Sequence, residues 1–190
     1  MIKSICHFYC KLRGWQVINK TPKELKLAVV IGYPHTSNWD FPTAMFAIKD
    51  QKLDYAKFGI KKEWLKPPFG WILRSLGAIG IDRSKNKDIS STKILADLFN
   101  NKEKLHLMIA PEGTRSRREK WRTGFYHIAQ MANVPIILFK ARYDQRIIYI
   151  GEKIIYPTDF EKDMIEITQY LKDGVGAIDS NASVDLRFDK

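Results

Sequence analysis

Short apolar segments that are typical of strands alternate with segments of helical periodicity along most of this chain. The apolar run 27–31 predicts a buried strand, and residues 41–48 read as the first turns of a helix with Pro42 near its start. This alternation predicts an α/β fold, a single-domain sandwich whose largely parallel or mixed sheet is flanked by helices. In such folds ligands bind beyond the carboxyl ends of the strands, so the loops at those ends carry the most information.

The remaining elements follow the same logic. Further strands are expected at residues 53–60, 77–81, 105–110, 135–141, 147–150 and 153–156. Further helices are expected at residues 69–76, 88–100 and 124–132, with a last one that opens on the capping-box pattern Thr158 to Glu161 and runs to about residue 172. The polar, weakly patterned tail from Gly174 onward is expected to be frayed or loosely docked.

We divide the chain into an amphipathic N-terminal segment (1–20), a main domain (21–173) and a polar tail (174–190). In the first segment, apolar residues share one helical face beside cationic residues; they are Ile2, Ile5, Phe8/Tyr9, Leu12 and Trp15. This pattern fits a helix in a membrane interface and equally a helix docked on its own domain. The segment lacks the uninterrupted apolar stretch of a signal peptide, and no apolar run is long enough to cross a bilayer.

The cysteine count and the net charge limit the kinds of site and partner that this chain can have. Cys6 and Cys10 are the only cysteines, and two thiols without further ligands predict apolar packing in a reducing compartment rather than a zinc site or a disulfide framework. The formal charge of +11 predicts an anionic partner, which is a nucleic acid, an anionic membrane surface or a phosphorylated substrate. Composition alone leaves these three open.

The loop after the first long strand holds His35 and Asp40, with four residues between them. On a regular helix these side chains would diverge, but in a loop the carboxylate can fold back to the imidazole. Such a contact would fix the tautomer of the ring and raise its basicity, as a general base requires. The alternative is a solvated histidine followed by a helix cap.

Two other loops at strand ends carry cations. Residues 111–124 place five cations within eight positions, from Arg115 to Arg122, after a glycine and beside hydroxyl residues. Arginine grips phosphate with two hydrogen bonds, so this loop predicts phosphate recognition, although a solvated basic loop is the alternative. Asp82 and Arg83 follow the expected strand 77–81, where a structural ion pair and a second phosphate-binding arginine are both possible readings.

Together these motifs resemble a known family. His35 through Asp40, Gly77 through Arg83, Pro111 through Ser116 and Val134 through Ile136 occur in the order and approximate spacing of the four motifs of glycerolipid acyltransferases. The chain is similar to the 1-acylglycerol-3-phosphate acyltransferase (lysophosphatidic acid acyltransferase) family, and to a compact bacterial branch in which the third motif runs on into the segment 121–126.

The resemblance implies roles for individual residues. His35 would take the proton from an acceptor hydroxyl and Asp40 would orient it, so these are the candidate catalytic residues. Arg83, Glu112 and Arg115 would bind the phosphate and glycerol of the acceptor, with Gly113 and Thr114 shaping the loop. Gly80 and Leu138 depart from the pattern of many relatives, so the resemblance does not identify which acyl chain is transferred or which acceptor receives it.

The resemblance also implies the substrates. The donor would be an acyl thioester, acyl-CoA or acyl carrier protein, and the acceptor a lysophospholipid; no metal, no other cofactor and no nucleic acid is expected. Both donors are acidic, as is an anionic membrane, so the charge of +11 suits all of these partners. We expect a cytoplasmic enzyme that associates peripherally with the inner face of the membrane through its basic amphipathic start and the segment 57–66.

Two other functions compete with acyl transfer. The charge and the aromatic residues beside cations, such as Trp64 and Trp121, would suit a nucleic-acid-binding module, although no recognised DNA- or RNA-binding signature is present. A metal-dependent phosphoesterase would use His35 and Asp40 as ligands, but two ligands in one loop are too few for such a site.

Overall fold

A mixed sheet forms the centre of the molecule. The computed structural model describes residues 2–51, 53, 55–68, 70–81 and 91–190, and within them seven strands lie in the order β1-β7-β6-β2-β5-β3-β4. The strands are β1 (Gln16–Asn19), β2 (Leu27–Tyr33), β3 (Ala56–Lys61), β4 (Ala78–Ile81), β5 (Leu105–Ile109), β6 (Ile136–Arg142) and β7 (Ile147–Ile155). All neighbours pair in parallel except β6 and β7, which are antiparallel. The predicted α/β domain with a largely parallel sheet is confirmed.

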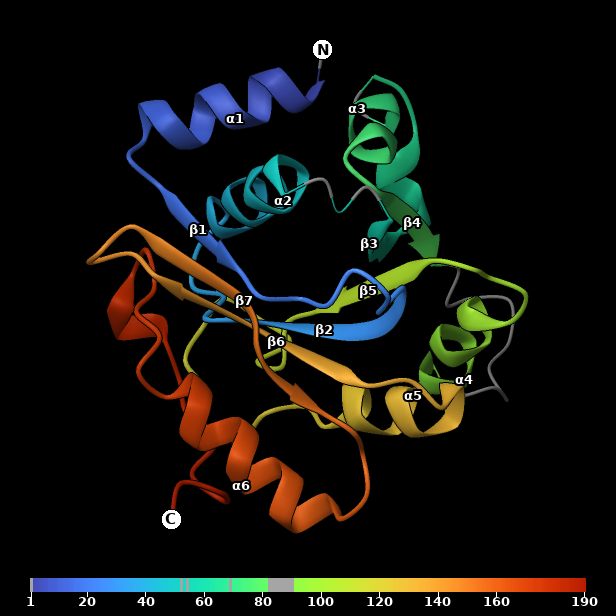
Figure 1. Ribbon diagram of the computed structural model, residues 1–190, viewed down its shortest axis with the longest axis vertical. Helices are drawn as coiled ribbons and strands as arrows, with labels where there is room; N and C mark the ends of the chain where they lie inside the picture. The colour runs from blue at the N-terminus through green and yellow to red at the C-terminus, as the bar shows by residue number, and fades with distance from the viewer. Residues whose placement is uncertain (1, 52, 54, 69, 82–90) are drawn as a thin grey trace.

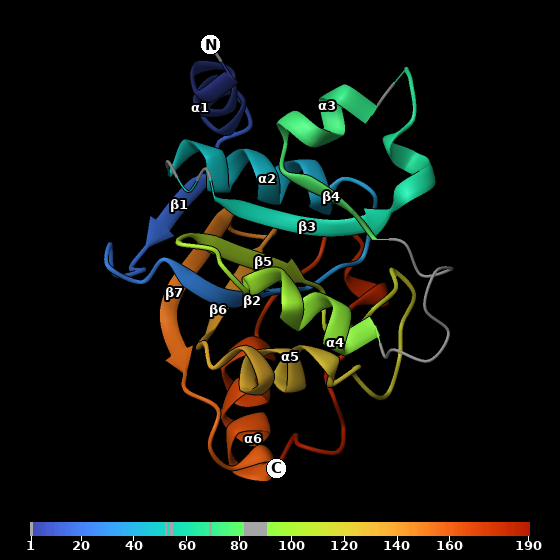
Figure 2. The ribbon, with the colours of Figure 1, turned by 90° about the vertical axis from the view of Figure 1, so that its right-hand side faces the viewer.

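Helices cover both faces of the sheet (Figures 1 and 2). One face carries α1 (Ile2–Leu12), α2 (Asp40–Asp50) and α3 (Gly70–Ser75), and the other carries α4 (Ser91–Ala96), α5 (Gly124–Ala132) and α6 (Phe160–Leu171). Short 3-10 helices occur at η1 (Lys62–Leu65), η2 (Asp97–Phe99) and η3 (Asp179–Asn181).

Strand β2 shows why two helical layers are needed. Successive side chains of a strand point to opposite faces. Val29, Ile31 and Tyr33 join the core under α5 and α6, whereas Ala28 and Val30 join the core under α2. All five are buried, so β2 is the central element of the sheet and its end is enclosed on both sides.

Several expected element boundaries were wrong. Strand β3 begins at Ala56 rather than Leu53, because Leu53 closes a turn by accepting a hydrogen bond from the Ala56 amide. The two short strands expected at 147–150 and 153–156 are one strand, β7. Gly151 adopts a positive φ of 70°, which allows the strand to continue past a shift in its register with β6. Strand β1, in the N-terminal segment, was not expected.

Two helices also differ from their predictions. The segment expected to be helical over 88–100 forms α4 from Ser91 and then the 3-10 helix η2, while residues 88–90 lie outside the described residues. Helix α6 is capped by Asp159 instead of Thr158, since the Asp159 carboxylate accepts from the Lys162 amide at 3.1 Å.

Helix α1 docks on α2 and still exposes apolar side chains. Cys6 and Cys10 are buried at this contact, and Tyr9 meets Phe46 edge-on with ring centroids 4.5 Å apart. The cysteines are therefore packing residues, as predicted. A row of apolar side chains on the other face of α1 points away from the domain, and these side chains are 55–70% exposed; they are Ile5, Phe8 and Leu12. Among the described residues, no helix is both long and apolar enough to cross a bilayer.

The C-terminal tail is firmly docked, so the expectation of a frayed end was wrong. Asp185 is fully buried, and its carboxylate accepts from the Trp121 amide at 3.1 Å and from the Arg187 guanidinium at 2.6 Å. The Trp121 indole donates to the Ser183 carbonyl at 2.6 Å. Trp121 is thus a buried anchor for the tail, which contradicts its reading as an aromatic available to stack on nucleic acid.

Candidate active site

The His35–Asp40 loop leaves the end of β2 and is closed by a carboxylate. Asp40 is the first residue of α2, and its Oδ2 atom accepts hydrogen bonds from the Thr36 amide at 2.5 Å and the Ser37 amide at 2.7 Å. These bonds pull the side chain back over its own loop. The predicted folding back of Asp40 toward His35 is therefore what the structure shows.

His35 and Asp40 are close but do not form a hydrogen bond. His35 Nδ1 lies 3.8 Å from Asp40 Oδ2, an ion-pair distance that exceeds the usual hydrogen-bond length. Burial lowers the pKa of His35, the negative charge of Asp40 partly opposes this, and the positive charge of Arg115 lowers the pKa further. The imidazole is consequently neutral at pH 7, the state in which it can accept a proton.

Arg115 reaches the same loop from the end of β5. Its Nη1 atom donates a hydrogen bond to Asn38 Oδ1, so the guanidinium lies across the loop that carries His35. Gly113 makes this approach possible with a positive φ of 66°, and a Cβ atom there would come within 2.7 Å of Arg122 Cδ. The structure thus brings Arg115 and His35 together, as the arrangement of strand ends predicted. Asn38 was not anticipated.

Glu112 lies behind the loop and supports it. The side chain is buried, and its Oε2 atom accepts a hydrogen bond from the His35 amide at 2.5 Å. Burial raises the pKa of Glu112 to about 7. Hydrogen bonds from the amides of His35 and Ser183 act in the opposite direction, but burial has the larger effect. Its predicted contact with an acceptor stays a prediction; in this structure the carboxylate holds the backbone of the candidate base.

The C-terminal tail supports the loop from a third direction. Thr36 Oγ1 accepts from the Ile178 amide at 3.2 Å, and the Thr36 carbonyl accepts from Asn181 Nδ2 at 3.3 Å. Gly176 packs so closely on Thr36 that a Cβ atom there would lie 2.5 Å from Thr36 Cγ2. These contacts could not be predicted from the sequence, because single polar residues in an aperiodic tail carry no pattern.

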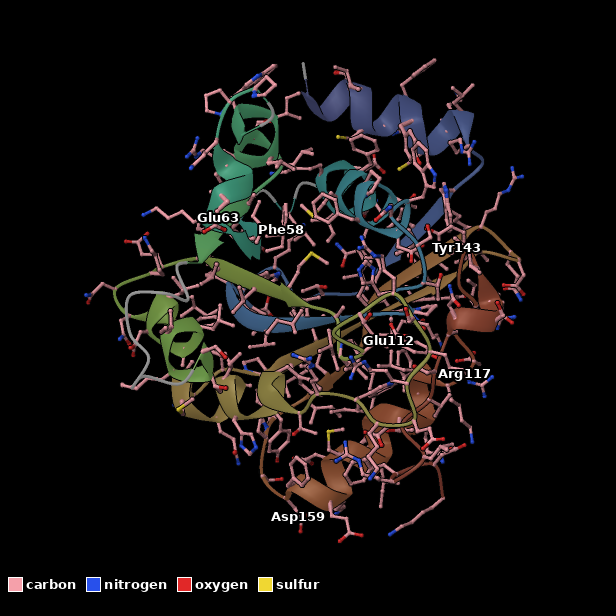
Figure 3. The ribbon with its side chains drawn as sticks, turned by 180° about the vertical axis from the view of Figure 1, so that it is seen from behind. Phe58, Glu63, Glu112, Arg117, Tyr143 and Asp159 are labelled. Atoms are coloured by element: carbon pink, nitrogen blue, oxygen red, sulfur yellow. The ribbon has the colours of Figure 1, made fainter. Side chains whose placement is uncertain are left out.

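A cavity of about 840 Å³ opens at this cluster. Its polar lining comes from His35, Asn38, Asp40, Thr43, Thr114, Arg115 and Tyr143. Most of the rest is apolar and includes Met45, Phe58, Ile60, Leu73, Leu107 and Met108. Figure 3 shows Phe58 on the β3 side and Glu112 in the loop beneath it. A cavity with a polar end and a long apolar lining suits a molecule with a charged head and a hydrocarbon chain.

Gly113 and Thr114 line this cavity with Arg115, and their predicted part in binding an acceptor stays a prediction. Arg83 lies outside the described residues, so its predicted contact with the acceptor stays a prediction. Within the described part of the chain, no group of three or more histidine, cysteine, aspartate or glutamate side chains is arranged to hold a metal ion.

The chain is similar to curated 1-acyl-sn-glycerol-3-phosphate acyltransferases. It is 30% identical to that of Haemophilus influenzae over 132 residues, which cover 66% of this chain and 53% of the relative. It is 32% identical to that of Escherichia coli over 108 residues, which cover 54% of this chain and 42% of the relative. The chain spans about half the length of the curated relatives it matches.

The fold has a solved counterpart. The crystal structure of the 1-acyl-sn-glycerophosphate (LPA) acyltransferase PlsC from Thermotoga maritima superposes with a TM-score of 0.61 at 18% identity, over 90% of this chain and 75% of that one. The family model named Acyltransferase matches residues 15–138, which contain the His35 and Arg115 loops and the start of β6. Because this match spans more than half of the sequence, the chain belongs to the acyltransferase family.

Proposed function

We propose that the protein transfers a fatty acyl group from an acyl thioester to the hydroxyl of a lysophospholipid such as 1-acylglycerol-3-phosphate. The observation that carries this proposal is the cluster of a neutral histidine, a carboxylate and an arginine at the polar end of an apolar cavity. The names of the similar proteins from Haemophilus influenzae and Escherichia coli support the same acceptor.

In this mechanism His35 is the general base. Its Nε2 atom takes the proton of the acceptor hydroxyl while the hydroxyl oxygen attacks the thioester carbonyl carbon. The new carbon–oxygen bond forms, the carbon–sulfur bond then breaks, and the imidazolium returns the proton to the departing thiolate. Asp40 stabilises the imidazolium through Nδ1, which requires the 3.8 Å contact to shorten when substrate binds.

Arg115 is the candidate ligand for the acceptor phosphate. Arg115 is exposed, lines the polar end of the cavity and already contacts the His35 loop through Asn38. A phosphate bound there would place the glycerol hydroxyl of the acceptor close to the imidazole. Arg83 remains a second expected phosphate ligand.

The apolar part of the cavity is the candidate site for a fatty acyl chain. Its lining comes from α2, β3, α3 and β5, and these elements put methionine, phenylalanine, leucine and isoleucine side chains around the space. Acyl-CoA and acyl carrier protein both remain candidate donors. No other cofactor is required by the proton and acyl transfers described above.

Membrane association is proposed for the face that carries α1 and α3. Helices α1 and α3 lie on the same side of the sheet (Figure 1). Both expose apolar side chains, which are the row of α1 described above and, on α3, Trp71 with 71% exposure. Exposed cations accompany these residues, including Lys11 and Arg74, and the whole chain carries a charge of +11. We therefore propose peripheral binding to an anionic lipid surface at the cytoplasmic side.

Vesicle sedimentation tests this surface. Replacing Ile5, Phe8 and Leu12 together by serine should weaken binding to vesicles that contain anionic lipid by at least about tenfold, because each exposed apolar side chain contributes on the order of 1 kcal/mol when it enters the interface. Met131→Ser, which changes an exposed apolar residue on α5, is the control. Equal binding by the triple variant and the wild type would contradict the proposal.

The proposed reaction is tested by product analysis. The purified protein is incubated with labelled acyl-CoA or acyl carrier protein thioesters and a panel of lysolipids with and without a phosphate. We expect a new acyl ester on a phosphate-bearing acceptor. If none of the acceptors is acylated by either donor, the proposed function is wrong.

A further inference from the structure

Tyr143 stands at the wall of the cavity, beside the carboxylate that faces the candidate base. It follows β6 directly, and its amide donates to the Val175 carbonyl at 3.1 Å. Its ring meets Trp15 edge-on at 4.8 Å, and both Tyr143 and Asp40 line the cavity. Figure 3 shows Tyr143 near the end of the β6–β7 hairpin, next to α2. Nothing in the family motifs points to this residue.

Two buried polar atoms near this position lack partners. Among the described residues, neither the Tyr143 hydroxyl nor Asp40 Oδ1 forms a hydrogen bond, although both atoms are inaccessible to solvent. The pKa of Tyr143 is raised, mainly by burial and next by the negative charge of Asp40. The hydroxyl therefore keeps its proton and is close enough to this carboxylate to interact with it electrostatically. Leaving a buried donor and a buried acceptor unpaired is costly, and a hydrogen bond between the two groups would remove both costs.

The surroundings of Asp40 show what such a pair would do. Its Oδ2 atom is held by the Thr36 and Ser37 amides, which still allows the carboxylate plane to rotate about that anchored atom. A second hydrogen bond at Oδ1 would fix the plane. Thr43 is the other hydroxyl facing Tyr143, and it is engaged with the Tyr9 hydroxyl at 3.2 Å.

We propose that Tyr143 is a positioning residue, whose hydroxyl donates to Asp40 Oδ1 and thereby holds the carboxylate in the orientation that stabilises the protonated His35. The role of Asp40 toward His35 rests on the proposed function. The contact between Tyr143 and Asp40, and its effect on the titration of His35, do not depend on which acyl acceptor is used.

The test compares two tyrosine-to-phenylalanine variants. Tyr143→Phe keeps the ring against Trp15 and removes only the hydroxyl. Tyr126→Phe is the matched control, because Tyr126 is also buried and also donates to a buried carboxylate, Asp163 at 2.7 Å, but lies under α6 away from the cavity. Thermal unfolding of both variants checks that they remain folded, and Tyr126→Phe is expected to lose at least as much stability.

The first readout is the separation of kcat from KM. We expect Tyr143→Phe to lower kcat by roughly ten- to a hundredfold, the penalty for a small misplacement of a reacting group, with KM for both substrates changed less than about twofold. Tyr126→Phe should leave both constants near the wild-type values. A raised KM with an unchanged kcat would mean that Tyr143 only shapes the cavity, and would overturn the proposal.

The second readout is independent of activity. The pKa of His35 is followed by NMR titration of its ring proton, assigned with a His35→Gln variant. In Tyr143→Phe this pKa should fall, because a mobile carboxylate stabilises the imidazolium less. In an Asp40→Asn background, Tyr143→Phe should cause no further change. An unchanged titration in Tyr143→Phe, or an equal shift in both backgrounds, would overturn the proposal; a shift in a protein that acylates no lysolipid would refute only the proposed function.

Discussion

The two loops that meet at the cavity are built in opposite ways. In the His35–Asp40 loop, Thr36, Ser37 and Asp40 are buried. The backbone is held by two hydrogen bonds: the His35 amide donates to Glu112, and the Thr36 carbonyl accepts from Asn181 of the tail. In the loop after β5, every residue from Arg115 to Lys120 is exposed, as Figure 3 shows for Arg117. One loop fixes a reacting group, and the other presents positive charge to solvent.

This difference matches two different tasks. A general base must be held within a fraction of an ångström of its substrate, which favours a loop whose polar groups are already paired. Phosphate recognition relies on long, charged side chains that attract an anion over several ångströms and then close on it. The first loop should therefore affect kcat and the second should affect acceptor binding.

Within the exposed loop, the largest effect is expected for Arg115→Ala. Loss of a charged hydrogen-bond donor to phosphate should raise KM for a phosphate-bearing acceptor by about ten- to a hundredfold, with a smaller change in kcat. Arg118→Ala, in the same exposed loop, is the control and should change KM by less than about threefold. If Arg115→Ala leaves KM unchanged, or affects an acceptor without a phosphate equally, the assignment of this loop is wrong.

A pH-dependent effect on stability is expected from Glu112, which supports the first loop. The pKa of Glu112 is about 7 in the folded protein and about 4.5 in the unfolded chain, so folding favours its protonated form. This preference contributes to the free energy of unfolding. The contribution is fully present below about pH 4.5 and is lost as the pH rises through 7, and the total loss is about 3 kcal/mol at most.

Denaturant titrations between pH 4.5 and 8 measure this effect. The free energy of unfolding of the wild type should fall with rising pH relative to that of Glu112→Gln, in which the group does not titrate. Half-buried His35 and buried His106 have lowered pKa values and therefore change stability in the opposite sense, but they are present in both proteins and cancel in the difference. Glu119→Gln, at an exposed position, is the control. A difference that does not vary with pH would show that Glu112 is ionised throughout.

The features that could be predicted from the sequence are those with a local pattern. The run 27–31 alternates between two buried faces and was correctly predicted as a strand. His35, Asp40 and Arg115 follow strand ends, and parallel pairing of β2 with β5 brings those ends together. The strands of a buried parallel sheet are strongly apolar. The positions of the strands in the sequence, and the polar loops at their carboxyl ends, could therefore both be inferred.

The features that were missed depend on contacts between distant residues. Asn181 contacts Thr36 across 145 positions, and Tyr143 faces Asp40 from the end of β6, which lies next to β2 in the sheet but far from it in the sequence. Strand β1 has only four residues, three of them half-buried, which is too short for periodicity to show. Single polar residues of this kind acquire their meaning only from the tertiary structure.

The central claim is that His35 is the base for acyl transfer, and His35→Ala tests it most directly. Acylation of a phosphate-bearing lysolipid is measured for the wild type, for His35→Ala and for His127→Ala, which removes an exposed histidine on α5 outside the cavity. We expect kcat of His35→Ala to fall by at least about 10²- to 10⁴-fold while its thermal unfolding and KM stay near the wild type, and His127→Ala to remain fully active. A folded His35→Ala variant that retains wild-type kcat would contradict the account.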